Sequence, residues 1–295
     1  MSAIAPWADR VKHTHAYFWS GSLHYINPIQ DYPPETCTAA FSDVRTPDRT
    51  LLTAIANYTE RLSDETLDRW PREEALRFLV HFMGDAEQPL HRNLPKLASD
   101  LAVTGRARGG NDIHLRFNGK NTSLHSVWDG LLISKLQRTL NPPLIRYDQF
   151  LTYLLEELQG RYLNSTARWL GCSHPISEQE QIVLNVVPGG YNAQGKCVEN
   201  WMEETHQLNC RGVWSFDTSN VRRERFLVDR DLVAEYWAKQ YGVEDVSGDM
   251  YGEYFDVDLS EGDYWEWIVH EEVVQQMLIR GGVRLASILN MVLDK

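Results

Sequence analysis

The sequence lacks an apolar run long enough to cross a membrane, since none approaches the roughly 18 residues that a transmembrane helix needs. It also lacks an excess of basic residues: 29 Lys and Arg stand against 41 Asp and Glu, and the net charge is −12. This balance argues against a protein that holds nucleic acid through a broad basic face. It is compatible with an enzyme whose phosphate-binding charge comes from bound cations.

Cysteine is scarce, and no two of the four cysteines form a C-x-x-C pair, so we do not expect a cysteine-ligated zinc site. Their number fits buried thiols as well as two disulfides. Three N-glycosylation sequons favour the second interpretation, because they are typical of secreted, disulfide-bonded glycoproteins. The cysteines are Cys37, Cys172, Cys197 and Cys210, and the sequons begin at Asn57, Asn121 and Asn164.

The chain begins without a recognisable signal peptide. The segment from Met1 to Trp7 has neither a basic start nor an apolar stretch of about 7–15 residues. Because the sequons favour secretion, we expect that an upstream stretch is missing from this sequence.

Strand signals are few, and most of the chain shows the apolar spacing of amphipathic helices. Residues 27–34 are rich in proline and are predicted to form a loop. The last predicted helix is interrupted by Gly281 and Gly282. Helices are predicted over 49–62, from Pro71 to Pro89, from Ser123 to Leu132, and near 146–160, 197–208, 229–241 and 263–293.

One short segment shows the alternation of a β-hairpin instead. Ile113, Leu115 and Phe117 are apolar at every second position, and Asn118-Gly119 follows as a turn. No linker-like stretch divides the chain. We therefore predict a mainly α fold, with a single domain over 1–295 and one small β-hairpin.

Histidine and aspartate recur in apolar surroundings. His81 and Asp85 lie four residues apart in one predicted helix, and His125 and Asp129 in another, so each pair projects from one helical face. Imidazole and carboxylate are suitable zinc ligands. A single such pair is more often a surface contact, or a core histidine bonded to a carboxylate. Three further candidates in similar flanks indicate a cluster of metal ions instead: Asp9, His24 and His91.

These ligands lie within a series of longer motifs. The motifs are Trp7-Ala8-Asp9, Leu23-His24-Tyr25-Ile26, Ala54-Ile55-Ala56-Asn57-Tyr58-Thr59, the run from His81 to His91, Gly109-Gly110-Asn111, the run from Leu124 to Asp129, and the run from Gly282 to Ala286. In this order they resemble the successive motifs of the S1/P1 nucleases, over essentially the whole chain. The resemblance implies a mainly helical fold shared with bacterial phospholipase C, and three zinc ions at the bottom of a cleft.

Carried over position by position, the resemblance also implies a ligand set. One zinc would be held by Asp9, His24, His81 and Asp85. A second, with an open place for water, would be held by His91, His125 and Asp129. Asp85 would also bridge toward a third zinc. The family further implies a disulfide between Cys37 and Cys210, which leaves Cys172 and Cys197 as the remaining pair.

The activity implied is hydrolysis of single-stranded DNA and RNA by a secreted monomer, to 5′-phosphate products, with 3′-nucleotidase activity. Zinc lowers the pKa of bound water toward about 7, which makes hydroxide available for attack on phosphorus. Single strands are favoured because a base must leave the stack to reach an aromatic platform. Tyr25 stands where the family carries such an aromatic residue, and it fits a packing role equally well.

Three features depart from the family pattern. The third zinc of the family is bound by an N-terminal Trp and by a His five residues later, and no such segment precedes Asp9 here. We expect either an incomplete gene product or a paralogue with impaired catalysis. Asn27 stands where many members carry Asp, and Lys12 where Arg is common. With Asp85, these two are the candidate catalytic side chains, and their replacement alters substrate handling rather than metal binding.

The remaining histidines and tryptophans are predicted to be structural or exposed. His13 and His15 are expected in an exposed loop, and His114 on the solvent face of the hairpin. The segment from Tyr264 to Trp267 is expected to be helix packing. Surface positions are expected for His174, His206 and His270.

Three functions therefore compete at the level of sequence. The first is the zinc endonuclease. The second is a phospholipase C-like zinc phosphodiesterase, which shares the fold and the metal chemistry. The third is a zinc-binding glycoprotein without turnover, which the absent N-terminal ligands favour. Tyr25 beside His24, with motif agreement along the chain, favours the nuclease.

Overall fold

The computed structural model describes residues 4–26, 33, 36–37, 49–91, 108–140, 142–171, 193–217, 221–225 and 251–293. Within them the fold is mainly helical, as predicted. The α-helices are α1 (Trp7–Val11), α2 (Leu51–Ser63), α3 (Arg69–Asp85), α4 (Leu124–Ser126), α5 (Leu132–Thr139), α6 (Tyr147–Gln159), α7 (Thr166–Leu170), α9 (Ala193–His206), α11 (Gly262–His270) and α12 (Val273–Leu293). Asn27, Cys172, His174 and the helix predicted at 229–241 lie outside the described residues.

Short helical turns connect these elements. The 3-10 turns are η1 (Phe18–His24), η3 (Pro89–His91), η4 (Arg108–Gly110) and η6 (Leu163–Ser165). Two further turns, η5 (Val127–Leu131) and η7 (Asn209–Val213), are π-helical. None of the helices within the described ranges combines the length and apolarity that crossing a bilayer requires.

The predicted hairpin is present as part of a larger sheet. Strands β1 (Ile113–Phe117) and β2 (Lys120–Ser123) pair antiparallel across a turn in which Asn118 and Gly119 both have positive φ. Two strands that sequence reasoning missed extend this sheet: β3 (Val221–Arg225) and β4 (Tyr251–Asp258). The strand order is β2-β1-β4-β3, with β4 parallel to β1 and antiparallel to β3. The expectation of a lone hairpin was therefore incomplete.

The C-terminal helix breaks elsewhere than predicted. Gly281 and Gly282 continue α12 without interruption, whereas the chain turns at Glu271 and Glu272, where Glu272 has a φ of 50°. Gly281 meets a packing need instead. A Cβ atom at this position would lie 2.9 Å from Cγ of Glu87, so only glycine lets α12 approach this side chain.

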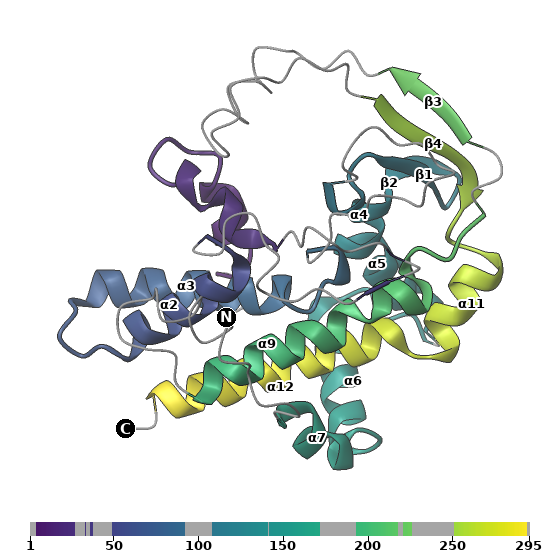
Figure 1. Cartoon of the computed structure of the whole chain (residues 1–295). Coiled ribbons are helices and arrows are strands. Elements are labelled where there is room, and N and C mark those ends of the chain that lie inside the picture. The colour runs from purple at the N-terminus through teal and green to yellow at the C-terminus, as the bar shows by residue number, and fades with distance from the viewer. Residues whose placement is uncertain are drawn as a thin grey trace.

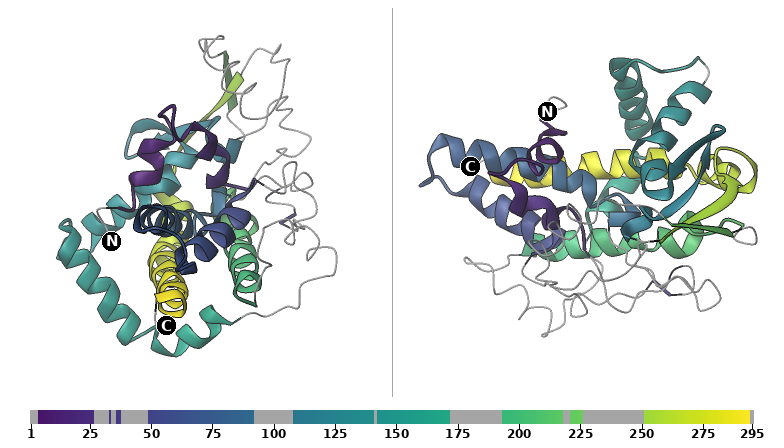
Figure 2. Two further views of the ribbon diagram at one scale, coloured as in Figure 1. Left: turned by 90° about the vertical axis from the view of Figure 1, so that its left-hand side faces the viewer. Right: turned by 90° about the horizontal axis from the view of Figure 1, so that it is seen from above.

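The helix α12 spans two hydrophobic cores (Figures 1 and 2). Its C-terminal half, with Ile288 and Leu289, packs with α2, α3 and α9. Its N-terminal half, with Val273 and Val274, packs with the sheet, α5 and α11. Because both halves of α12 contribute buried residues, it fixes the helical half of the molecule relative to the half that carries the sheet.

The end of α9 and the turn η7 are held by disulfide bonding and by buried hydrogen bonds. Cys210 forms the expected disulfide with Cys37, and Cys197 is also disulfide-bonded. His206 is fully buried, so its predicted surface position was wrong. Its Nδ1 atom lies 3.1 Å from Asn209 Nδ2, which also donates to the carbonyl of Pro89. Burial of this imidazole is tolerated because a polar partner faces it.

Candidate metal centre

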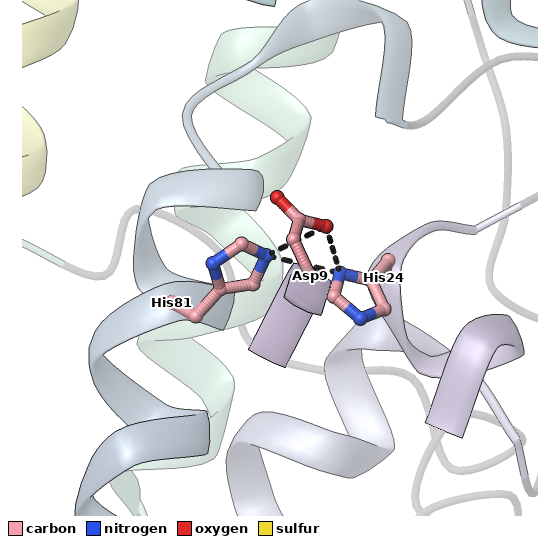
Figure 3. Close-up of side chains that lie close together, drawn as sticks. All are labelled: Asp9, His24 and His81. Carbon is pink, nitrogen blue, oxygen red and sulfur yellow. Dashed lines mark hydrogen bonds and ion pairs between the residues drawn. The ribbon is translucent and has the colours of Figure 1, made fainter. Parts of the chain in front are cut away.

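Four side chains from three separate elements converge at the end of α3. Asp9 comes from α1, His24 from the end of η1, and His81 with Asp85 from α3; we call these four the first ligand group. Figure 3 shows the Asp9 carboxylate and the two imidazoles pointing toward one another. Asp9 Oδ1 lies 3.6 Å from His24 Nδ1 and 3.5 Å from His81 Nε2. The two imidazole nitrogens are 3.0 Å apart.

The ligand atoms of Asp9, His24 and His81 lie close enough together to hold one metal ion, and their spacing can be compared with that of a zinc site. Zinc bonds of about 2.0–2.2 Å place neighbouring tetrahedral ligand atoms about 3.3–3.6 Å apart. Asp85 Oδ2 lies 3.0 Å from His24 Nδ1 and 3.2 Å from His81 Nε2, which agrees with this spacing to within a few tenths of an ångström. Two imidazoles and two carboxylates are also a donor set that zinc accepts. The residues present therefore fit the ion.

A second ligand group consists of His91, His125 and Asp129. His125 Nε2 lies 3.2 Å from Asp129 Oδ2, and His91 Nε2 lies 3.6 Å from Asp129 Oδ1. The two imidazole rings are nearly parallel, with centroids 5.1 Å apart. This group has one ligand fewer than the first, which is the pattern of a metal site that keeps a position open. Among the described residues, two sets have metal-binding spacing: Asp9, His24 and His81 form one, and His91, His125 and Asp129 form the other.

Asp85 connects the two groups. Its Oδ2 atom faces the imidazoles of the first group, while Oδ1 lies 3.3 Å from His91 Nδ1 in the second. The side chain is buried, and the imidazoles of His24, His81 and His91 contact it. One carboxylate thus contacts ligands of both groups.

Backbone carbonyls orient two of the histidines. His81 Nδ1 lies 2.7 Å from the carbonyl of Ala5, and His125 Nδ1 lies 2.8 Å from the carbonyl of Gly109. Each Nδ1 must donate to its carbonyl, which leaves Nε2 to face the carboxylates. This outer contact is typical of metal-bound histidine. In His24 the polar contacts lie on Nδ1, and Nε2 is buried without a hydrogen-bond partner.

The electrostatics of both groups favour a cation. Burial alone would lower the pKa of His81, but its contacts with Asp85 and Asp9 raise it to about 10. Burial likewise opposes the charge on His91, and the carboxylates of Asp85 and Asp129 raise its pKa to about 10. Burial would raise the pKa of Asp85, but the surrounding imidazoles hold it well below its usual value. The carboxylates therefore stay ionised and attract positive charge, as protons or as metal ions.

Local sequence explains why the His and Asp of each four-residue pair lie on the same side of their helix. His81 and Asp85 are separated by four residues in a regular helix, so they share one face. His125 and Asp129 have the same separation, but α4 passes into the π-turn η5 between them. The prediction of a regular helix from Ser123 was wrong at this turn, although Ser123 caps α4 as expected. π-turns of this kind occur frequently at functional sites.

The other predicted site residues are placed differently. Lys12 Nζ lies 2.6 Å from Asp9 Oδ1, at the rim of the first group. Tyr25 is half-buried directly after His24. Of the histidines expected outside the site, His270 is exposed, as predicted, whereas His114 is half-buried on β1. His13 and His15 are exposed.

Sequence reasoning missed the contacts of two residues in the loop between Asp85 and His91. Glu87 is buried and accepts hydrogen bonds from Arg284 Nη1 at 2.7 Å and from Arg280 Nε at 2.8 Å. Gln88 donates to Asp129 Oδ1 at 2.8 Å. The sequence does show two polar residues, Glu87 and Gln88, between the candidate ligands Asp85 and His91. It does not show their partners, which lie far away in sequence.

Comparison with known proteins gives a consistent result. A family model described as S1/P1 Nuclease matches residues 1–244. Nuclease PA3 of Penicillium sp is 29% identical over 293 residues, which cover 98% of this chain and 83% of that protein. Nuclease P1 of Penicillium citrinum is 28% identical over 303 residues, with coverages of 98% and 83%. Endonuclease 1 of Arabidopsis thaliana is 28% identical over 307 residues, with coverages of 99% and 75%.

Proposed function

Since this chain belongs to the S1/P1 nuclease family, we propose that it is a zinc-dependent endonuclease acting on single-stranded DNA and RNA. One observation carries the proposal: two His and Asp groups with zinc-like spacing are joined through the buried carboxylate of Asp85. Fungal relatives named nuclease P1 and nuclease S1 align over most of the chain, the latter at 24% identity.

The residues of the first ligand group would hold one zinc, and those of the second would hold another. Zinc bound there would supply Lewis acidity toward a phosphate group and would lower the pKa of a bound water. Asp85 supplies negative charge to both groups. Because Asp85 is buried, water does not screen its charge, and its attraction for a cation in either group is stronger. The open coordination position expected of the second group would admit the substrate phosphate.

The exposed side of the two groups is where a nucleic acid strand would approach. The side chains of Asp9 and Asp129 are 52% and 47% exposed, so each group reaches the surface. Lys12 offers an ammonium group beside Asp9, which can contact a phosphate oxygen. Tyr25 is the proposed base-stacking residue, and a base can stack on it only after leaving a duplex. Asn27 is the proposed amide contact near the substrate.

The products proposed from the family resemblance are 5′-phosphates, and 3′-nucleotides are proposed as further substrates. Secretion and N-glycosylation are also proposed. They are supported by the disulfide between Cys37 and Cys210, which is typical of extracellular proteins. The sequon residues Asn121 and Asn164 are exposed, whereas Asn57 is half-buried within α2, so the first two suit a glycan best.

The proposal is tested by measuring metal content and substrate range together. We expect the purified protein to contain zinc, and to cleave denatured DNA and RNA much faster than duplex DNA. Chelation should abolish cleavage and added zinc should restore it. The variant His81→Ala should lose activity, while the matched control His270→Ala, an exposed histidine on α11, should retain it.

Each alternative function has its own outcome in these assays. Cleavage of phosphatidylcholine without cleavage of DNA would favour the phospholipase C-like reaction. Bound zinc without cleavage of DNA, RNA or lipid would favour the inert glycoprotein. Absence of zinc binding would contradict the assignment of both ligand groups.

A further inference from the structure

Gln88 makes four hydrogen bonds that join residues of both ligand groups. Its backbone N–H donates to the carbonyl of Asp85 at 3.1 Å, and its own carbonyl accepts from the N–H of His91 at 3.0 Å. Its side-chain Nε2 donates to Asp129 Oδ1 at 2.8 Å, and its Oε1 accepts from the N–H of Leu90 at 2.5 Å. The residue is only 8% exposed, so these bonds form away from solvent.

The two side-chain partners determine which way the amide points. The N–H of Leu90 can only donate, so the oxygen of the Gln88 amide must face it. The NH₂ group is thereby directed at the carboxylate of Asp129. A carboxylic acid in place of this amide would present an oxygen to Asp129 instead, and an apolar side chain would present nothing.

From this geometry we infer that Gln88 is a positioning residue for the second ligand group: its amide holds the carboxylate of Asp129 in the orientation that faces His91 and His125. Oδ1 of Asp129 accepts from the amide and lies 3.6 Å from His91 Nε2, and Oδ2 lies 3.2 Å from His125 Nε2. The donor is neutral, so it orients the carboxylate without cancelling its negative charge. The inference rests on the proposed zinc-dependent function.

The surroundings of Asp129 make such a contact necessary. Its side chain is 47% exposed, and it projects from a π-turn rather than from a regular helix. An exposed carboxylate without an outer contact samples several orientations, and each must be given up when a metal ion binds. Outer contacts of this kind typically contribute about 10–100-fold to metal affinity or activity.

The test compares Gln88→Met with Gln207→Met. Methionine matches glutamine in length but can neither donate nor accept in this way. Gln207 is a part-buried glutamine whose amide donates to the carbonyl of Cys37 at 2.8 Å and to Glu203 Oε1 at 3.0 Å, and neither partner belongs to a ligand group. The measurement is zinc retained by the full chain at buffered free-zinc concentrations, with the melting temperature recorded for each variant.

The first group offers four ligands and the second offers three, so we expect two classes of zinc in the wild-type protein. In Gln88→Met, the weaker class should require about 10–100-fold more free zinc, while the tighter class is unchanged. Gln207→Met should match the wild type in both classes. An unchanged weaker class in Gln88→Met, or an equal loss of both classes, would overturn the inference. Failure of the wild type to bind any zinc would instead contradict the proposed function.

A measurement on the wild-type protein tests the same inference if Gln88→Met does not fold. In a crystal structure of the zinc-loaded protein, the carboxylate of Asp129 should bind zinc and should still accept from Gln88 Nε2. A Gln88 amide turned away from this carboxylate in the zinc-loaded protein would overturn it.

Discussion

In the first ligand group the exposed carboxylate of Asp9 is held by the charged side chain of Lys12, whereas in the second the carboxylate of Asp129 is held by the neutral amide of Gln88. Three residues of each group have metal-binding spacing, and the first group has Asp85 as a fourth candidate ligand, in contact with His24 and His81. A metal ion in the first group is therefore more completely surrounded by protein. Under the proposed function, the first group would retain a metal ion, and the second would leave a metal ion accessible to the substrate.

The largest expected effect comes from removing the residue that the two groups share. Asp85→Asn keeps the shape of the side chain but removes the charge that contacts His24, His81 and His91. We expect loss of zinc from both groups and a fall in single-stranded DNA cleavage of more than about a hundredfold, because this residue is itself a ligand rather than an outer contact. Zinc analysis and an initial-rate assay check this. Retention of both zinc classes would show that the groups are independent.

A second pair of variants separates the groups. His24→Ala removes a ligand from the first group only, and His125→Ala removes one from the second only. Each variant should lose one class of zinc and keep the other, and both should be nearly inactive because the proposed reaction needs both ions. Stoichiometry by elemental analysis is the readout. If both variants lose the same class, the division into two groups is wrong.

A smaller effect is expected from the network behind the loop between Asp85 and His91. Glu87→Gln breaks a buried ion pair with Arg280 and Arg284, both of which belong to α12. Removal of one partner from such a network typically costs about 3–5 kcal/mol of unfolding free energy. Chemical denaturation should show this loss. Because the loop carries ligands of both groups, both zinc classes should weaken together, in contrast to the selective effect expected of Gln88→Met.

The mildest prediction concerns the pH dependence of the zinc-free protein. The pKa values of His81 and His91 are raised from 6.5 to about 10 in the folded chain. Their contribution to stability is therefore fully present below pH 6.5 and is lost as the pH rises toward 10. With a chelator, the melting temperature should fall across this range. With zinc it should fall less, since zinc replaces the protons. A melting temperature that rises with pH in chelator would contradict these raised pKa values.

Local sequence patterns were sufficient for most of the fold and for the two His and Asp pairs with four-residue spacing. The four-residue spacing in α3 predicted that His81 and Asp85 share a face, and Asn118-Gly119 predicted the hairpin turn. Patterns of short range were insufficient where the partner is remote. The strand β4 pairs with β1 across more than 100 residues, and the burial of His206 depends on packing beneath the loop that holds Pro89. The contact of Gln88 with Asp129 likewise joins residues that are remote in sequence, so local patterns could not predict it.

The most direct test of the two-group account is anomalous diffraction at the zinc absorption edge from crystals of the zinc-loaded protein. The account predicts one peak enclosed by Asp9, His24, His81 and Asp85, and another enclosed by His91, His125 and Asp129. Zinc bound elsewhere in the molecule, or an absence of zinc from both groups, would contradict it.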